Sequence, residues 1–188
     1  MQRETVRATA YVFLGRSFNS AISLVFSLIA GRLLSVEEHG LYGRTLATIV
    51  IIQAVAEFGL QLSLVRYLSA ELRGDRRNVG ALLRASIILK LSGLALPFVL
   101  ILVYQGVLHI QGLPWQTLLW LALLGGTGLS LLSYLDSLLV SYEAYGRLAL
   151  WLPSTGFFRL GLLTFFYFQQ KIDAAHVLFA FSLAPYLA

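Results

Sequence analysis

The sequence predicts an all-α membrane protein, a polytopic bundle of about six transmembrane helices, and three observations lead to this prediction. First, 58% of the 188 residues are hydrophobic and only 12% are charged, whereas soluble domains carry about 25% charged residues. Second, the apolar runs are long and continuous, unlike the alternating segments of roughly 10 residues found in membrane barrels. Third, the chain has no cysteine, which excludes disulfide scaffolds, thiol catalysis and cysteine-based metal sites.

Six apolar segments follow one another with short connections, and residues 1–188 are therefore expected to form a single transmembrane domain. The predicted spans are, in order, about Thr9–Leu34, Leu41–Leu68, Ala81–Val107, Trp115–Ser141, Leu148–Phe168 and a last segment starting near Ala174. The first segment is too long for the apolar part of a cleaved signal peptide, so it is interpreted as the first helix of the mature protein.

Basic residues lie on alternate connections, which predicts the orientation. One side carries Arg3, Arg7, Arg73, Arg76, Arg77 and Arg147, whereas the loops of the other side carry Lys171 as their one basic residue. Because short loops rich in Lys and Arg stay in the cytoplasm, we expect a multi-pass protein of the inner or plasma membrane with a cytoplasmic N-terminus. The net charge of +5 then reflects topology, and no nucleic-acid partner is expected.

The first span carries a polar face. Arg16, Ser20, Ser23, Ser27 and Gly31 fall at helical spacing, with Asn19 beside them. Two interpretations stay open: close helix packing through the small residues, or a wall of a water-filled cavity. Arg16 favours the cavity, because close packing alone does not explain a guanidinium.

Further polar residues interrupt the second and third spans. Gln53, Glu57 and Gln61 recur at steps of four, and Lys90 lies in the third span before Pro97, which is expected to kink that helix. Glu57 has two open interpretations: a structural pair with Arg16 or Lys90, or a proton or cation site.

The fourth and fifth spans contain glycines and two more charges. Gly125, Gly126 and Gly128 indicate either a flexible point or a close helix crossing. Asp136 lies near the inner end of its span, and Arg159 lies near the middle of the next, where snorkelling does not explain it.

The charges expected inside the bundle are three cations, Arg16, Lys90 and Arg159, and the carboxylate Glu57. If they converge on one cavity, this balance suits an anionic substrate such as a phosphate or pyrophosphate headgroup, which arginine binds as a bidentate fork. No catalytic residue, cofactor or metal site is predicted.

One stretch, Ala30–Ser69, resembles the beginning of polysaccharide-biosynthesis membrane proteins. Its elements are Arg-Leu-Leu at 32–34, an acidic turn with Gly-Leu-Tyr at 37–42, Glu-Phe-Gly-Leu at 57–60 and Val-Arg at 65–66. Such proteins are lipid-linked oligosaccharide flippases of the multidrug/oligosaccharidyl-lipid/polysaccharide exporter superfamily.

The resemblance implies a helix bundle of two lobes around a central cavity that opens alternately to each side, this chain being the N-terminal lobe. It implies an undecaprenyl-pyrophosphate-linked glycan as substrate and membrane lipids as partners. Arg16 and Arg44 match by position the cavity arginines of related flippases. Ion coupling in the family would give Glu57 or Asp136 a role. The substrate-binding candidates are therefore Arg16, Asn19, Ser23, Arg44, Lys90 and Arg159.

Other functions stay open. A drug or cation exporter of the same superfamily would favour acidic over basic cavity residues, and a membrane glycan-assembly enzyme would need a catalytic group in a sizeable loop. A non-transporting assembly subunit is a further alternative. The last segment is shorter than the about 20 residues of a full crossing. The sequence is therefore expected to end within a sixth helix, or to pair with a second chain that completes the cavity.

Overall fold

The computed structural model describes residues 2–108, 115–169 and 172–188, with side chains from residue 10 onward except 104–116 and 170–171. The described residues form helices and no strand, which confirms the all-α prediction. The helices are α1 (Gln2–Leu33), α2 (Val36–Glu57), α3 (Leu60–Arg73), α4 (Val79–Leu108), α5 (Trp115–Ser141), α6 (Tyr145–Phe168) and α7 (Ala174–Leu187).

Four described helices, α1, α4, α5 and α6, are long and apolar enough to cross a membrane, and the bent pair α2 and α3 makes a fifth span if counted as one. α5 begins and ends at the predicted residues. α7 is apolar but has only 14 residues, so the expectation of six spans is met by at most five together with one short helix.

The second predicted span, Leu41–Leu68, is not continuous. It breaks at Phe58 and Gly59, whose φ angles of 46° and 67° are left-handed, and the two helices meet at a bend of 40°. A left-handed residue ends the α-helical hydrogen-bond ladder, and it is unfavourable for a side chain such as phenylalanine. The Glu-Phe-Gly-Leu element of the sequence is therefore the break itself.

The acidic turn is the first turn of α2, and together with Ser35 it forms a capping box. The Ser35 side chain accepts a hydrogen bond from the Glu38 backbone N–H, and the Glu38 carboxylate accepts one from the Ser35 N–H at 2.9 Å. Both donors belong to the first turn, where no intrahelical acceptor is available. This accounts for the position at which the chain reverses between α1 and α2.

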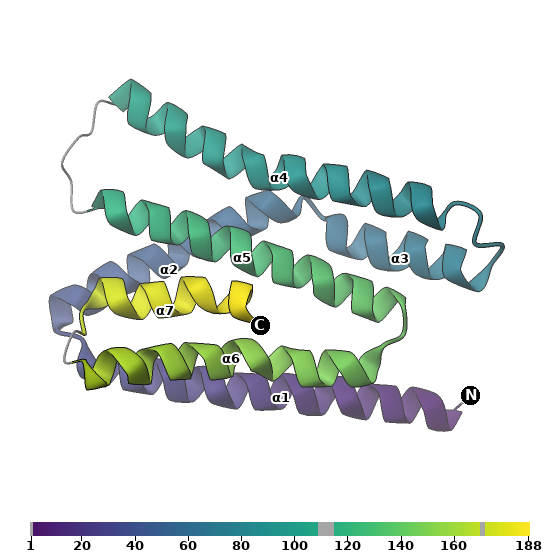
Figure 1. The fold of residues 1–188 in the computed structure, drawn as a ribbon, viewed down its shortest axis with the longest axis horizontal. Coiled ribbons are helices and arrows are strands. Elements are labelled where there is room, and N and C mark those ends of the chain that lie inside the picture. Colours follow the sequence, from purple (N-terminus) through teal and green to yellow (C-terminus); the bar gives the residue numbers. More distant parts are fainter. Residues whose placement is uncertain (1, 109–114, 170–171) are drawn as a thin grey trace.

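The helices lie alongside one another (Figure 1). α6 packs along α1 at one side, α4 lies with α3 at the other, α5 runs between them, and the short α7 packs against α5 and α6. The N-terminal end of α1 and the α3–α4 and α5–α6 connections lie at one end of the bundle, and the α1–α2 connection, the end of α6 and the start of α7 lie at the opposite end (Figure 1). The connections predicted to be basic thus lie at the same end of the bundle. That this end faces the cytoplasm stays a prediction. Lys171 lies outside the described residues.

The glycines of α5 mark a close helix crossing rather than a flexible point. A Cβ at Gly126 would lie 2.5 Å from Ile52 Cγ2 and 2.9 Å from the Ile49 carbonyl oxygen of α2. A Cβ at Gly125 would lie 2.7 Å from the Ser182 hydroxyl of α7. α2 and α7 therefore approach α5 to a distance that only glycine permits at these positions.

The interface of α1 with α6 differs from the expected one. A Cβ at Gly15 would lie 2.9 Å from Ala149 Cα, and a Cβ at Gly156 would lie 2.7 Å from Ile22 Cγ2. Phe26 continues this buried face of α1. Of the two open interpretations of the polar face, close packing through Ser23, Ser27 and Gly31 does not apply to this interface, because Ser27 and Gly31 are exposed and Ser23 is half-buried.

Candidate functional site

The first group of polar residues surrounds the break between α2 and α3. Lys90 of α4 is 4% exposed, and its Nζ donates a hydrogen bond to the Ser130 hydroxyl of α5, which is 0% exposed. Glu57, the last residue of α2, lies within electrostatic range of Lys90 and accepts a hydrogen bond from Gln53 Nε2 at 2.8 Å. Of the two bases considered for Glu57, Lys90 is the one whose electrostatic interaction with it the structure shows.

A second hydrogen bond joins α4 and α5 one helical turn away from the Lys90–Ser130 bond. The hydroxyls of Ser86 and Tyr134 are 2.8 Å apart, each four residues from a member of the Lys90–Ser130 pair. Below the break, Gln61 Nε2 of α3 donates to the Ser133 carbonyl at 3.2 Å, whereas the Ser133 hydroxyl is buried without a hydrogen-bond partner. Three helices thus bring a line of polar groups to the break.

The second group is centred on Arg159 of α6, which is 8% exposed. Its guanidinium carbon lies 3.9 Å from the centre of the Phe181 ring of α7, and the buried Tyr42 of α2 lies within electrostatic range. A cation over an aromatic face recovers part of the energy lost on leaving water. The Nε atom remains buried without a hydrogen-bond partner, so the site does not fully satisfy this arginine.

The third group lies on the polar face of α1. Arg16 is exposed and within electrostatic range of the half-buried Asp136 of α5, whose Oδ1 is buried without a hydrogen-bond partner. Asn19, half-buried one turn further along α1, also has an unpaired buried Oδ1. Ser20 and Ser27 are exposed, so the described part of the chain leaves most of this face uncovered.

The structure joins some of the predicted site residues and separates others. It places Arg16 within electrostatic range of Asp136 and Lys90 within electrostatic range of Glu57, while Arg159 is covered by Phe181. Arg44 is exposed near the start of α2, at the opposite end of the bundle from the N-terminus. The predicted convergence of all these cations on one cavity therefore stays a prediction.

Several partners were not anticipated from the sequence. Phe181 lies in an apolar segment and Tyr42 in the Gly-Leu-Tyr element, and nothing in either sequence indicates that the residue lies next to an arginine. Ser133 sits among several serines of α5, and only the packing of α3 shows that its hydroxyl is the unpaired one.

The comparison with protein families gives one finding. A family model described as "Polysaccharide biosynthesis protein" matches residues 5–135, from the beginning of α1 nearly to the end of α5. The matched part contains Arg16, Glu57 and Lys90 and ends before Asp136 and Arg159. The chain matches no curated protein and no solved structure.

Proposed function

Because the chain belongs to the polysaccharide biosynthesis protein family, we propose that it helps to move a lipid-linked oligosaccharide or polysaccharide precursor across the cytoplasmic membrane. It is a multi-pass membrane protein, with several helices long enough to cross a bilayer. Members of this family are generally transporters rather than enzymes, which supports a flippase over a glycan-assembly enzyme.

The exposed position of Arg16 is the observation that carries the proposal. A charged side chain facing hydrocarbon costs about 2.5–3.5 kcal/mol or more, so such residues face water, a partner or a bound group. Arg16 lies on a helix long enough to span, and the described chain does not cover it. We propose that this face lines the transport pathway and that its cargo is an undecaprenyl-pyrophosphate-linked glycan.

The neighbours of Arg16 suit a reversible contact with pyrophosphate. Guanidinium groups bind phosphate oxygens as a fork, and Asp136 balances the arginine's charge when no cargo is present. Asn19 and Ser23 offer further hydrogen bonds on the same helix. Arg44 would meet the cargo at the opposite end of the pathway, as alternating access moves it outward.

The buried cations have a different proposed role. Lys90 and Arg159 are enclosed by their partners, so they would reach a cargo only after the helices rearrange. We propose that they contribute positive potential from within the lobe, while Glu57 and Asp136 are the candidates for ion coupling. A drug or cation exporter is less well supported, because the uncovered face of α1 presents an arginine.

Transport by reconstituted protein tests the proposal. The protein is placed in liposomes with a fluorescent lipid-linked oligosaccharide, and its movement between leaflets is followed by quenching. Arg16→Ala should abolish movement and Arg16→Lys should retain part of it. Arg32→Ala is the matched control, since Arg32 is an exposed arginine on the same helix but about 160° around it. Full transport by Arg16→Ala would overturn the assignment of this face to the cargo.

A further inference from the structure

The end of the bundle that holds the N-terminus contains a pocket that plays no part in the proposed transport pathway. It has a volume of about 380 Å³ and lies where α3 and α5 end. We call it the loop-end pocket, and its polar lining consists of Ser69, Arg73, Arg76, Ser141, Tyr142 and Glu143. Its volume is sufficient for a phosphate group with part of the molecule that carries it.

Two arginines supply the positive charge of the loop-end pocket. Arg73 donates from Nη2 and Nε to one oxygen of Glu143, at 2.6 and 3.2 Å, so this carboxylate already occupies an anion position. The two side chains are 74% and 54% exposed, and such exposed pairs contribute little stability and exchange readily. The side chain of Arg76 makes one hydrogen bond that the structure shows, from its Nε to the Leu72 carbonyl at 3.1 Å.

The backbone is strained at two of the residues that line the pocket, Arg76 and Glu143. Arg76 and Glu143 both have a φ of 57°, and among the described residues Phe58 is the one other non-glycine residue with a positive φ. Left-handed conformations are unfavourable for such residues and concentrate at functional sites. Two connections from different parts of the chain thus hold Arg76, and the carboxylate that is bonded to Arg73, at the same pocket in unfavourable conformations.

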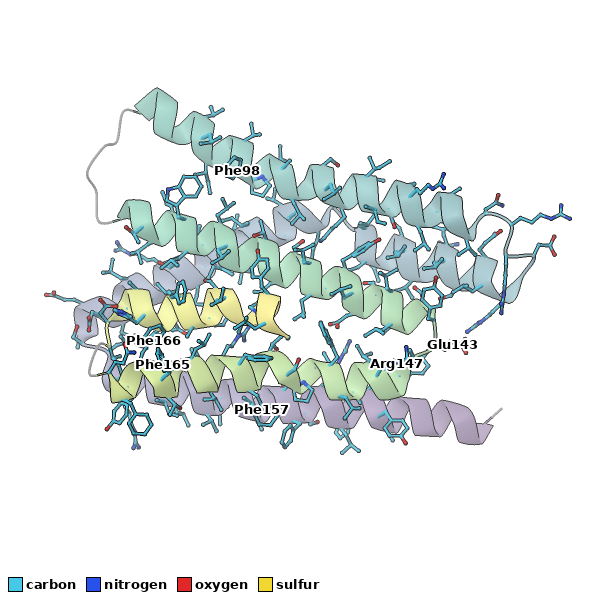
Figure 2. The ribbon with its side chains drawn as sticks, viewed as in Figure 1. Phe98, Glu143, Arg147, Phe157, Phe165 and Phe166 are labelled. Carbon is cyan, nitrogen blue, oxygen red and sulfur yellow. The ribbon has the colours of Figure 1, made fainter. Side chains whose placement is uncertain are left out.

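The position of the pocket indicates where its ligand comes from. Tyr142, which lines it, is 50% exposed, and Tyr67 on α3 is 59% exposed. Tyrosines of this kind lie at the membrane–water interface. Glu143 and Arg147 lie together at this end of the bundle (Figure 2), so Arg147 in the first turn of α6 is a further cation there. The phosphate group of a membrane lipid lies at this same interface, so it would be at the depth of the pocket.

We propose that the loop-end pocket binds the phosphate group of an anionic membrane lipid, with the phosphate replacing the Glu143 carboxylate on Arg73 and contacting Arg76. Basic pockets between membrane helices are suited to such headgroups. The hydroxyls of Ser69 and Tyr142 line the same space and would supply hydrogen bonds to the phosphate oxygens. This binding does not depend on transport of a glycan.

Lipid binding to the full chain in detergent tests the proposal, with phosphatidylglycerol as the probe and native mass spectrometry as the readout. The double variant Arg73→Ala/Arg76→Ala should bind it about tenfold more weakly or worse. The matched control is Arg66→Ala/Arg84→Ala, which removes two exposed arginines from the same end but outside the pocket lining. Equal losses in the two double variants would overturn the proposal, since binding would then follow the overall charge.

Two further arms complete the test. Glu143→Gln removes the competing carboxylate and should tighten phosphatidylglycerol binding several-fold, a gain that misfolding does not produce. Weaker binding by Glu143→Gln would contradict the exchange on Arg73. Inorganic phosphate serves as the free source, and a protein that binds it while showing no pocket-dependent binding of phosphatidylglycerol would overturn the lipid as the ligand.

Discussion

Lys90 of α4 donates a hydrogen bond to the Ser130 hydroxyl of α5 inside the bundle, within electrostatic range of Glu57, the carboxylate that ends α2. The two side chains are almost completely enclosed. The ammonium group is therefore held by a neutral hydroxyl, with Glu57 near enough to act on its charge but positioned to bond Gln53.

This arrangement predicts different effects for single and double replacement. Ser130→Ala leaves the buried Lys90 without its hydrogen bond and should lower the free energy of unfolding by about 1–3 kcal/mol. The double variant Ser130→Ala/Lys90→Met removes the charge and its acceptor together, keeps a similar volume, and should be neutral or stabilising. Thermal unfolding in detergent compares the two. A loss of stability for the double variant larger than for Ser130→Ala would contradict this account of the site.

A second prediction concerns the crossing of α5 with α2. Gly126→Ala places a methyl group 2.5 Å from Ile52 Cγ2, and overpacking of this kind costs about 1–3 kcal/mol. Gly161→Ala in α6 is the control, because a Cβ there has no atom within 4 Å, and alanine is the better helix former by about 1 kcal/mol. Unfolding midpoints should shift in opposite directions. Equal shifts would show that the crossing is not tight.

A third prediction separates water-facing from lipid-facing positions on α1. The chain has no cysteine, so single cysteines are unambiguous reporters. Arg16→Cys should react quickly with a charged aqueous thiol reagent, and the exposed Leu14→Cys, about 160° around the helix, should not. Similar rates at both positions would argue against a hydrated polar face.

The same reagent tests the covering of Arg159. Arg159→Cys should react slowly because Phe181 lies over this position, and adding Phe181→Ala should raise the rate. Fast reaction of Arg159→Cys alone would instead favour the predicted shared cavity with Arg16. A slow rate that Phe181→Ala leaves unchanged would show that another group covers the site.

A fifth prediction concerns the start of α7. Asp173 Oδ1 accepts hydrogen bonds from the His176 backbone N–H at 2.8 Å and from His176 Nδ1 at 2.7 Å. Burial alone would raise the pKa of Asp173, but the hydrogen bonds and charge of His176 outweigh it and hold this pKa below its usual value. A lowered pKa adds stability that is present above the unfolded value of about 3.9 and is lost as the pH falls through the folded value.

Substitution at this cap should follow that dependence. Asp173→Ala should cost about 1 kcal/mol of stability at neutral pH, and the cost should shrink below about pH 3, where the carboxylate is protonated. Asp173→Asn retains an acceptor for the cap and is the control. Denaturant unfolding between pH 7 and pH 3 measures the difference, and a cost that stays constant with pH would contradict an ionised cap.

The helices were predictable to the extent that their apolar runs are unambiguous. α5 begins and ends as expected because a continuous apolar run is bounded by Trp115 and by the polar turn after Ser141. The break in the second span was missed because the apolar pattern continues across it, and a single glycine is tolerated in a helix. The left-handed conformation of Phe58 is rare for this residue type, so no local pattern predicts it.

The candidate site was predictable in its residue types but not in its grouping. Depth along a span can be counted from the sequence, so Arg16, Lys90 and Arg159 stood out. Their partners depend on the rotation of each helix about its axis and on the order in which helices pack. The spacing of Ser23, Ser27 and Gly31 left both close packing and a cavity wall open, whereas the interface of α1 with α6 depends on Gly15 and Gly156.

The break at Phe58 and Gly59 also has a mechanical consequence. α2 is held at Ala56, where a Cβ at Gly93 of α4 would lie 2.7 Å from its carbonyl oxygen, while α3 is tied to α5 by the bond from Gln61 to the Ser133 carbonyl. Torque applied to α3 is not passed on through a continuous helical ladder to α2. α2 and α3 can therefore change their angle to each other at this break, while α4 and α5, which run continuously beside both helices, hold the two ends of the bundle together.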